Sequence, residues 1–119
     1  MHYEALKERA AFQSGGDVEE LPDLEPYAGQ YVNEGYRRLV MLLGGDPPLP
    51  LELNEDEPTL PAWMHPAIAD FATWMLLRNG NPQRQARGVQ YRAAFEETVA
   101  TALRGTRRHF IGLYGTSEE

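Results

Sequence analysis

The chain has no cysteine, two serines and three histidines among its 119 residues. The absence of cysteine excludes a disulfide framework, a thiolate zinc site and a cysteine nucleophile. Ser14 and Ser117 do not lie in the strand–turn–helix elbow that exposes a serine nucleophile. His2, His65 and His109 are too far apart in the sequence for two imidazoles to share one helix face. The commonest nucleophiles and the usual zinc sites are therefore missing.

The sequence also lacks a run of about 18 consecutive apolar residues, the length that a membrane-spanning helix requires. Charged residues interrupt its opening stretch, MHYEALKERAAF, where a secretory signal would be apolar. We therefore expect a protein that neither spans a membrane nor is exported, and the absence of cysteine suits a reducing compartment.

Basic residues are scarce in the first half of the chain. Residues 1–60 carry 13 acidic and 4 basic side chains, whereas residues 61–119 carry 5 and 7. The net charge of the whole chain is −7, which opposes attachment to a nucleic-acid backbone as the main activity. An acidic first half and a mildly basic second half fit head-to-tail association of identical subunits.

The acidic clusters do not form an enzymatic or metal site. Glu96 and Glu97 are neighbours on a predicted helix, so their carboxylates point about 100° apart and cannot act as a facing pair. The run Asn54–Glu57 lacks the alternating aspartates and the central glycine of an EF-hand loop. We predict that the protein is not an enzyme and uses no cofactor or metal ion.

Apolar residues at spacings of three and four predict four helices, over residues 1–13, 27–43, 63–79 and 82–103. The stretch Asn79-Gly80-Asn81-Pro82 supplies a helix stop followed by a first-turn proline, so the last two helices should form an antiparallel hairpin. The length of the chain corresponds to one domain. The fold class is predicted as all-α, with a four-helix domain over residues 1–104.

Two segments are predicted to lie outside the helices. Residues 44–60 form a connector rich in proline and acidic residues, in which the alternation of Leu49, Leu51 and Leu53 leaves room for a short β segment. Gly105 is expected to end the fourth helix, which would make residues 105–119 an extended C-terminal arm.

The arm begins with cations and continues with apolar side chains. Its basic cluster is Arg104, Arg107, Arg108 and His109, and its apolar residues are Phe110, Ile111, Leu113 and Tyr114. Cations at a helix C-terminus stabilise the helix by about 0.3–1 kcal/mol, which accounts for Arg104 better than for the later residues. The apolar part is predicted either to fold back on the helices or to dock on a neighbouring protein.

Several motifs resemble those of the head–tail connector proteins of tailed bacteriophages, also called adaptor or head-completion proteins. They are YVNEGYRRLV, then LPAWMHPAIADFATWML after a proline-rich connector, then NGNPQRQ and YRAAFEETV. The positions that match the family pattern, together with the aromatic residues of the hairpin, are Asn33, Glu34, Tyr36, Leu60, Pro61, Trp63, His65, Phe71, Trp74, Tyr91, Phe95 and Glu96. Within this set, we expect His65 to cap the turn at Trp63 or to lie at a subunit interface.

This resemblance implies a structural neck protein of the virion that forms a ring of about twelve copies beneath the portal protein. The ring would join the DNA-filled head to the tail or stopper protein, let genomic DNA pass without sequence recognition, and assemble in the host cytoplasm. The arm, Arg104–Tyr114, would reach toward the portal. Many members have a longer, β-containing segment where this chain has only residues 44–59, so the tail-facing surface should differ.

Two other functions fit parts of the sequence. Pro66–Leu103 could form the helix–turn–helix of a small regulatory nucleic-acid-binding protein, although the acidic total and the single cation of the third helix, Arg78, oppose this. The chain could also be a non-viral helical adaptor or chaperone that binds a partner protein.

Overall fold

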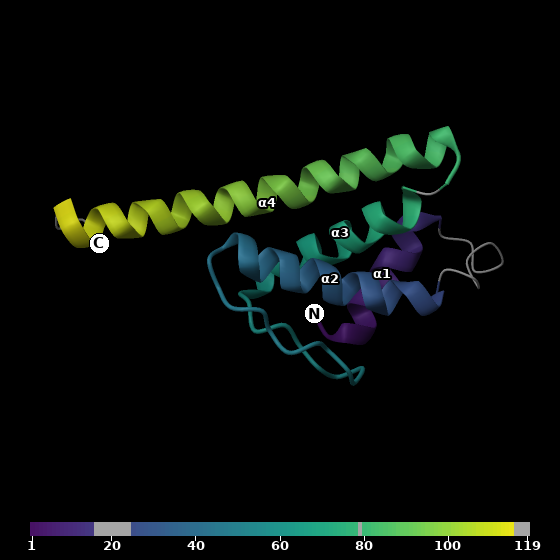
Figure 1. Cartoon of the computed structure of the whole chain (residues 1–119), viewed down its shortest axis with the longest axis horizontal. Helices are drawn as coiled ribbons and strands as arrows, with labels where there is room; N and C mark the ends of the chain where they lie inside the picture. Colours follow the sequence, from purple (N-terminus) through teal and green to yellow (C-terminus); the bar gives the residue numbers. More distant parts are fainter. Residues whose placement is uncertain (16–24, 79, 116–119) are drawn as a thin grey trace.

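The computed structural model describes residues 1–15, 25–78 and 80–115 of the chain. It contains the four helices α1 (Tyr3–Ser14), α2 (Glu25–Leu42), α3 (His65–Leu77) and α4 (Pro82–Gly115), and a single 3₁₀ turn, η1 (Ala62–Met64), leads into α3. The prediction of an all-α fold with four helices is confirmed, and α3 and α4 form the predicted antiparallel hairpin (Figure 1).

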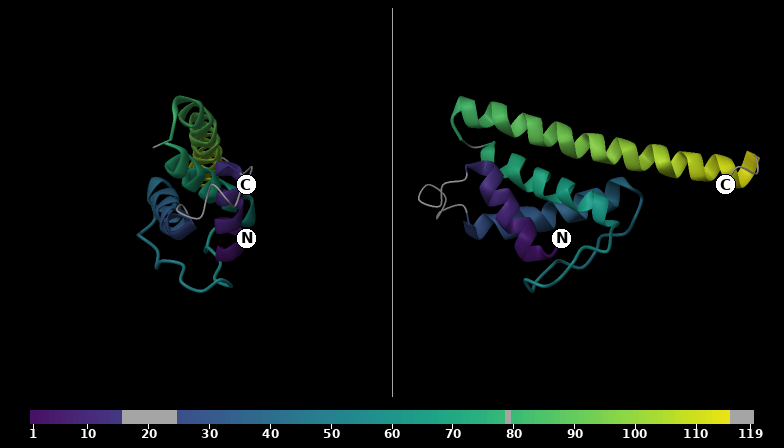
Figure 2. Two further views of the ribbon diagram at one scale, coloured as in Figure 1. Left: turned by 90° about the vertical axis from the view of Figure 1, so that its right-hand side faces the viewer. Right: turned by 180° about the vertical axis from the view of Figure 1, so that it is seen from behind.

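The central element of the fold is α3. Seen end-on, it lies in the middle of the molecule with α1, α2 and α4 arranged around it (Figure 2). Its buried residues are His65, Ala67, Ile68, Ala69, Phe71, Ala72, Thr73, Leu76 and Leu77. A helix that is apolar around most of its circumference must be enclosed by protein, and the three neighbouring helices provide this cover.

The surrounding helices bury narrower faces. In α1, the predicted stripe of Tyr3, Leu6 and Ala10 is buried. In α2, Val32, Tyr36 and Leu39 are buried and follow the predicted spacing. Full burial of a large apolar side chain contributes about 1.5–3 kcal/mol, so these stripes hold α1 and α2 against α3 and against each other.

Two buried glycines allow the helices to approach α3 closely. A Cβ atom at Gly35 of α2 would lie 3.0 Å from Phe71 Cδ1 and 3.1 Å from the carbonyl oxygen of Ile68. A Cβ atom at Gly88 of α4 would lie 3.2 Å from Leu77 Cβ. At these glycines α2 and α4 therefore lie close to α3.

The fourth helix is longer than the sequence pattern predicts. We expected it to end near Leu103, but α4 continues through Gly105 to Gly115. The prediction was wrong because a single glycine costs a helix only about 1 kcal/mol, which is too little to end it without a capping arrangement. The last turns of α4 extend past the ends of α2 and α3 (Figure 1). The radius of gyration, 15.8 Å, accordingly exceeds the value of about 13.5 Å for a compact chain of this length.

The connector over residues 44–60 contains no strand, so the short β segment is not formed. The alternating leucines do not pack as a strand would, because Leu51 is buried whereas Leu49 and Leu53 are both exposed. The connector instead crosses the side of α2 that lies away from α4 (Figure 1).

We predict opposite effects for two glycine-to-alanine substitutions. Gly35→Ala should lower the free energy of unfolding by roughly 1–2 kcal/mol, because the overpacking against α3 exceeds the gain in helix propensity. Gly105→Ala should raise the free energy of unfolding by about 0–1 kcal/mol, because nothing beyond the backbone of its own helix lies within 4 Å of the added Cβ. Urea unfolding followed by circular dichroism measures both. Equal effects of the two substitutions would contradict the close approach of α2 to α3.

Candidate functional site

Polar side chains of α2 hold the connector in place. The Asn33 side chain donates from Nδ2 to the carbonyl oxygen of Leu51 at 3.0 Å, and its Oδ1 accepts from the Leu51 backbone N–H at 2.7 Å. This amide pairs with Leu51 in the way that a neighbouring strand would, so both backbone groups of a buried residue are satisfied without a sheet. We call this pair of hydrogen bonds the Asn33 latch.

A second attachment lies at the other end of the connector. The backbone N–H of Thr59 donates to the Tyr36 hydroxyl at 3.0 Å, and the hydroxyls of Tyr36 and Thr59 are 2.9 Å apart. Asn33 and Tyr36 are three residues apart on α2, so their side chains lie on the same face of the helix. Two residues of the Asn-Glu-x-Tyr motif therefore position the connector.

The N-terminal end of α1 holds the connector from its other side. The backbone N–H of Tyr3 donates to the carbonyl of Asp56 at 2.7 Å, and that of Glu4 donates to the carbonyl of Asn54 at 3.1 Å. These are N–H groups in the first turn of a helix, which have no partner within the helix itself. The connector therefore accepts hydrogen bonds from the first-turn N–H groups of α1, while side chains of α2 hold it in place.

Asp56 organises the turn at the tip of the connector. Its Oδ2 accepts from the backbone N–H groups of Glu52 at 2.9 Å and Leu53 at 2.8 Å. The hydrogen bonds from Leu53 and then Glu52 lower the pKa of the Asp56 carboxyl, since they stabilise its charged form. The tip is thus ordered although it is exposed.

His65 is buried and has a structural position. The amino group of Met1 lies 2.6 Å from Nδ1, and Nε2 lies 2.7 Å from the carbonyl oxygen of Leu60. Because an amino group can only donate here and a carbonyl can only accept, Nδ1 is the acceptor and Nε2 carries the proton. His65 therefore joins the start of the chain to the end of the connector, whereas Trp63 beside it is exposed.

The aromatic residues of the hairpin form one cluster where α3 meets α4. The ring of Phe71 lies 5.2 Å from that of Phe95 and 5.5 Å from that of Trp74, between centroids. Each tilted or edge-on aromatic pair stabilises the fold by about 0.5–1.5 kcal/mol beyond the contribution from burial of its rings. Phe71 and Phe95 are buried, so these two predicted site residues belong to the core.

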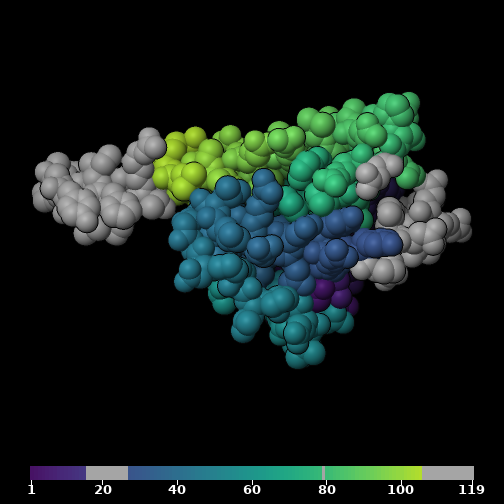
Figure 3. All heavy atoms as spheres, in the orientation of Figure 1, coloured from purple at the N-terminus to yellow at the C-terminus, as the bar shows by residue number. Residues whose placement is uncertain are grey.

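An open groove lies where α2 packs on α3. The outer helices α2 and α4 both pack on α3 but hardly touch each other. The groove has a volume of about 570 Å³, and it is lined by Glu34, Arg37, Arg38, Met41 and Leu42 of α2 and by Phe71, Trp74, Met75 and Arg78 of α3. We call it the arginine groove. In Figure 3, α3 is visible between α2 and α4 along this gap.

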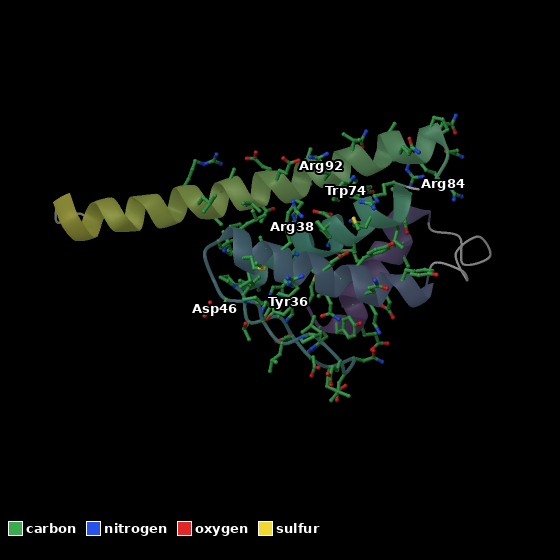
Figure 4. The ribbon with its side chains drawn as sticks, in the orientation of Figure 1. Tyr36, Arg38, Asp46, Trp74, Arg84 and Arg92 are labelled. Atoms are coloured by element: carbon green, nitrogen blue, oxygen red, sulfur yellow. The ribbon has the colours of Figure 1, made fainter. Side chains whose placement is uncertain are left out.

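The arginine groove is positively charged although the chain as a whole is acidic. It contains three guanidinium groups and one carboxylate, that of Glu34. Within the described residues, neither Arg37 nor Arg38 forms an ion pair. The guanidinium of Arg92, from α4, lies 5.2 Å from the centroid of the Trp74 ring, which closes the upper edge. Figure 4 shows Arg38 pointing from α2 toward this edge, on the opposite side of α2 from Tyr36.

The other predicted site residues do not join one site. Leu60 and Tyr91 are half-buried, Pro61 is exposed, and Glu96 pairs with Arg92 at 3.2 Å on the surface of α4. Arg104 lies 3.1 Å from the Thr101 hydroxyl and 3.5 Å from Glu97. The side chains of Arg107, Arg108, His109, Phe110, Ile111, Leu113 and Tyr114 lie outside the described residues.

Sequence reasoning did not find the groove. Its walls come from residues that look like an ordinary solvated face of α2, and only the packing of α2 and α4 on a shared helix creates the gap. The available signal was the adjacent pair Arg37 and Arg38, because only four basic residues occur among the first 60. Single-helix periodicity cannot show where two faces meet.

In the described part of the chain, no three or more histidine, aspartate or glutamate side chains come together as metal ligands. None of its helices combines the length and apolar character needed to cross a membrane. No protein-family model, curated protein or solved structure matches the chain significantly.

We predict that Asn33→Ala lowers the free energy of unfolding by about 2 kcal/mol, because it removes two hydrogen bonds and leaves Leu51 unpaired. Gln30→Ala, at an exposed position on the same helix, is the matched control and should cost less than about 0.5 kcal/mol. Urea unfolding gives the free energies, and amide exchange at Leu51 reports the latch itself. Unchanged protection of Leu51 in Asn33→Ala would show that the latch is not formed.

We predict that the turn at the connector tip loosens in acid. Since folding lowers the pKa of Asp56, the turn is stabilised above the ordinary aspartate pKa of about 4, and this contribution is lost as the pH falls through the lowered value. Amide exchange of Glu52 and Leu53 between neutral and acidic pH, corrected for intrinsic exchange rates, measures the loss. In Asp56→Ala the protection should be low at every pH, and protection that persists in this variant would contradict the assignment.

Proposed function

We propose that this protein is a structural subunit of a bacteriophage head–tail connector. In this proposal it forms a homo-oligomeric ring at the neck of the virion, bound to the portal protein on one side and to the tail or stopper protein on the other. Genomic DNA passes through the ring without sequence recognition. The protein is not an enzyme in this role, because its work is to bury surface shared with its neighbours.

The observation that carries the proposal is the projection of α4. The helix continues to Gly115, beyond the part that packs on α3 (Figure 1). The sequence places the apolar residues of the arm, Phe110, Ile111, Leu113 and Tyr114, in this last part of the helix. A helix that carries apolar residues and extends past the other helices of its own subunit is suited to bind a groove on a partner protein. This supports docking on a neighbour over an arm that folds back.

The motif residues support the fold of such a subunit more directly than its partners. Asn33, Tyr36 and His65 all fix the connector over residues 44–60, so their pattern is explained by the construction of the domain. The portal, the tail and the twelve-fold ring therefore rest on the sequence resemblance together with the projecting helix.

The helix–turn–helix alternative receives less support. In Figure 1, α4 runs back along α3 in an antiparallel arrangement, whereas the two helices of a DNA-binding helix–turn–helix cross steeply.

We predict that deletion of residues 105–119 leaves the helical body folded but abolishes binding to portal-bearing heads. The truncated chain keeps every described contact of α3 and should unfold with nearly unchanged free energy. Deletion of residues 116–119 alone is the matched control, because it retains α4 to its end. Co-sedimentation with heads that carry the cognate portal, followed by negative-stain microscopy, gives the result.

Normal head binding by the 105–119 deletion would refute the role of the projecting helix. A full-length protein that ignores portal-bearing heads but shifts DNA in a salt-dependent gel assay would instead establish the nucleic-acid alternative.

A further inference from the structure

Two surfaces of this subunit complement each other. They lie along different faces of α2 and meet at Glu34 and Arg37, which also border Pro48–Pro50 of the connector. One is the arginine groove, and the other is the connector over residues 44–60 (Figure 4). We infer that the connector of one copy docks into the arginine groove of a second copy. The inference rests on the proposed function at one point: it identifies the contact between copies by which the proposed ring would form.

The connector has the acidic and apolar side chains expected of a segment that binds in the arginine groove. It has five acidic residues and no basic residue: the acids are Asp46, Glu52, Glu55, Asp56 and Glu57. Two of its leucines are unusually exposed for large apolar side chains, Leu49 at 88% and Leu53 at 59%. A segment with apolar anchors inside an acidic rim requires a site with apolar and basic residues.

The arginine groove provides these residues. Arg37 and Arg38 offer guanidinium groups that make no ion pair within the described part of their own subunit, and guanidinium binds carboxylate with two parallel hydrogen bonds. Met41 and Leu42 beside them are exposed at 47% and 46%. Methionine adapts its shape to the side chain that it receives. The volume of about 570 Å³ is that of a binding cleft.

The connector is ordered before it docks. The Asn33 latch fixes its middle, Tyr36 fixes its end, and Asp56 closes the turn at its tip. Binding therefore does not have to order a flexible loop, and the entropy that such ordering would cost does not weaken the interface.

The placement of the two surfaces determines the kind of assembly. In Figure 1 the connector passes along the side of α2 away from α4, while the arginine groove is lined by α2 and α3. Two different patches on one subunit form a heterologous contact, in which a docked pair still offers one free groove and one free connector. Such contacts produce a closed ring when the rotation between copies closes, and a filament when it does not.

The experiment uses the purified full-length chain in analytical ultracentrifugation and light scattering. The wild type should self-associate, and added salt should weaken the association because the contact is charged. The groove variant Arg37→Glu/Arg38→Glu and the connector variant Leu49→Ser/Leu53→Ser should each lower the association constant by roughly tenfold or more. Circular dichroism confirms that both remain folded, as is expected for exposed positions.

Mixing the two variants gives the decisive result. The groove variant has an intact connector, which can enter the intact groove of the connector variant. The opposite contact, between the mutated connector and the mutated groove, is lost. We expect a 1:1 dimer that does not grow further. The matched controls are Arg87→Glu on α4, whose guanidinium donates to the carbonyl oxygen of Gln13 of α1, and Phe12→Ser on α1. Both positions are exposed and lie outside the groove lining, and each variant should associate as the wild type does.

A monomeric wild-type chain, or variants that associate normally, would overturn the inference and assign the groove to another partner. A mixture that stays monomeric would overturn it as well. Self-association by this contact without binding to portal-bearing heads would instead refute the proposed function and leave the inference standing. Conversely, if the wild type binds heads and its groove variant still forms rings, the inference is refuted and the proposed function stands.

Discussion

The structure depends on the burial of α3. This helix is apolar around most of its circumference, and Ile68, Phe71 and Leu77 are almost completely removed from solvent. Each contributes about 1.5–3 kcal/mol through burial, and no single neighbouring helix could cover all three. The protein therefore surrounds α3 with α1, α2 and α4, and it places Gly35 and Gly88 where the outer helices must come closest.

Three exposed features of the molecule follow from this arrangement. Because α2 and α4 pack on α3 rather than on each other, the arginine groove stays open where α2 meets α3. Because α4 is much longer than α3, its last turns extend beyond the helical body. The connector, fixed by Asn33 and Tyr36, occupies the remaining side of α2. One central helix thus explains a groove, a projecting helix and an acidic loop.

Much of the fold could be predicted from the sequence, because local patterns determine it. The spacing of Tyr3, Leu6 and Ala10 predicted the buried face of α1, and Asn79–Pro82 predicted the hairpin. The end of α4 could not be predicted from Gly105, since one glycine weakens a helix without stopping it. The connector was misread as a partial strand because its hydrogen bonds come from Asn33, which lies 18 residues from Leu51. The groove could not be predicted because it forms only when separate helices pack together. No single residue of the chain indicates that packing.

Amide hydrogen exchange of the isolated chain under native conditions tests the central claim most directly. If α3 is the enclosed helix on which the fold depends, the amides from Ile68 to Leu76 should exchange only through global unfolding, with the free energy that urea unfolding gives. The amides beyond Gly105 should exchange much faster, because the last turns of α4 extend past α2 and α3 (Figure 1). Exchange of α3 through smaller openings, or equal protection of the last turns of α4, would contradict the account.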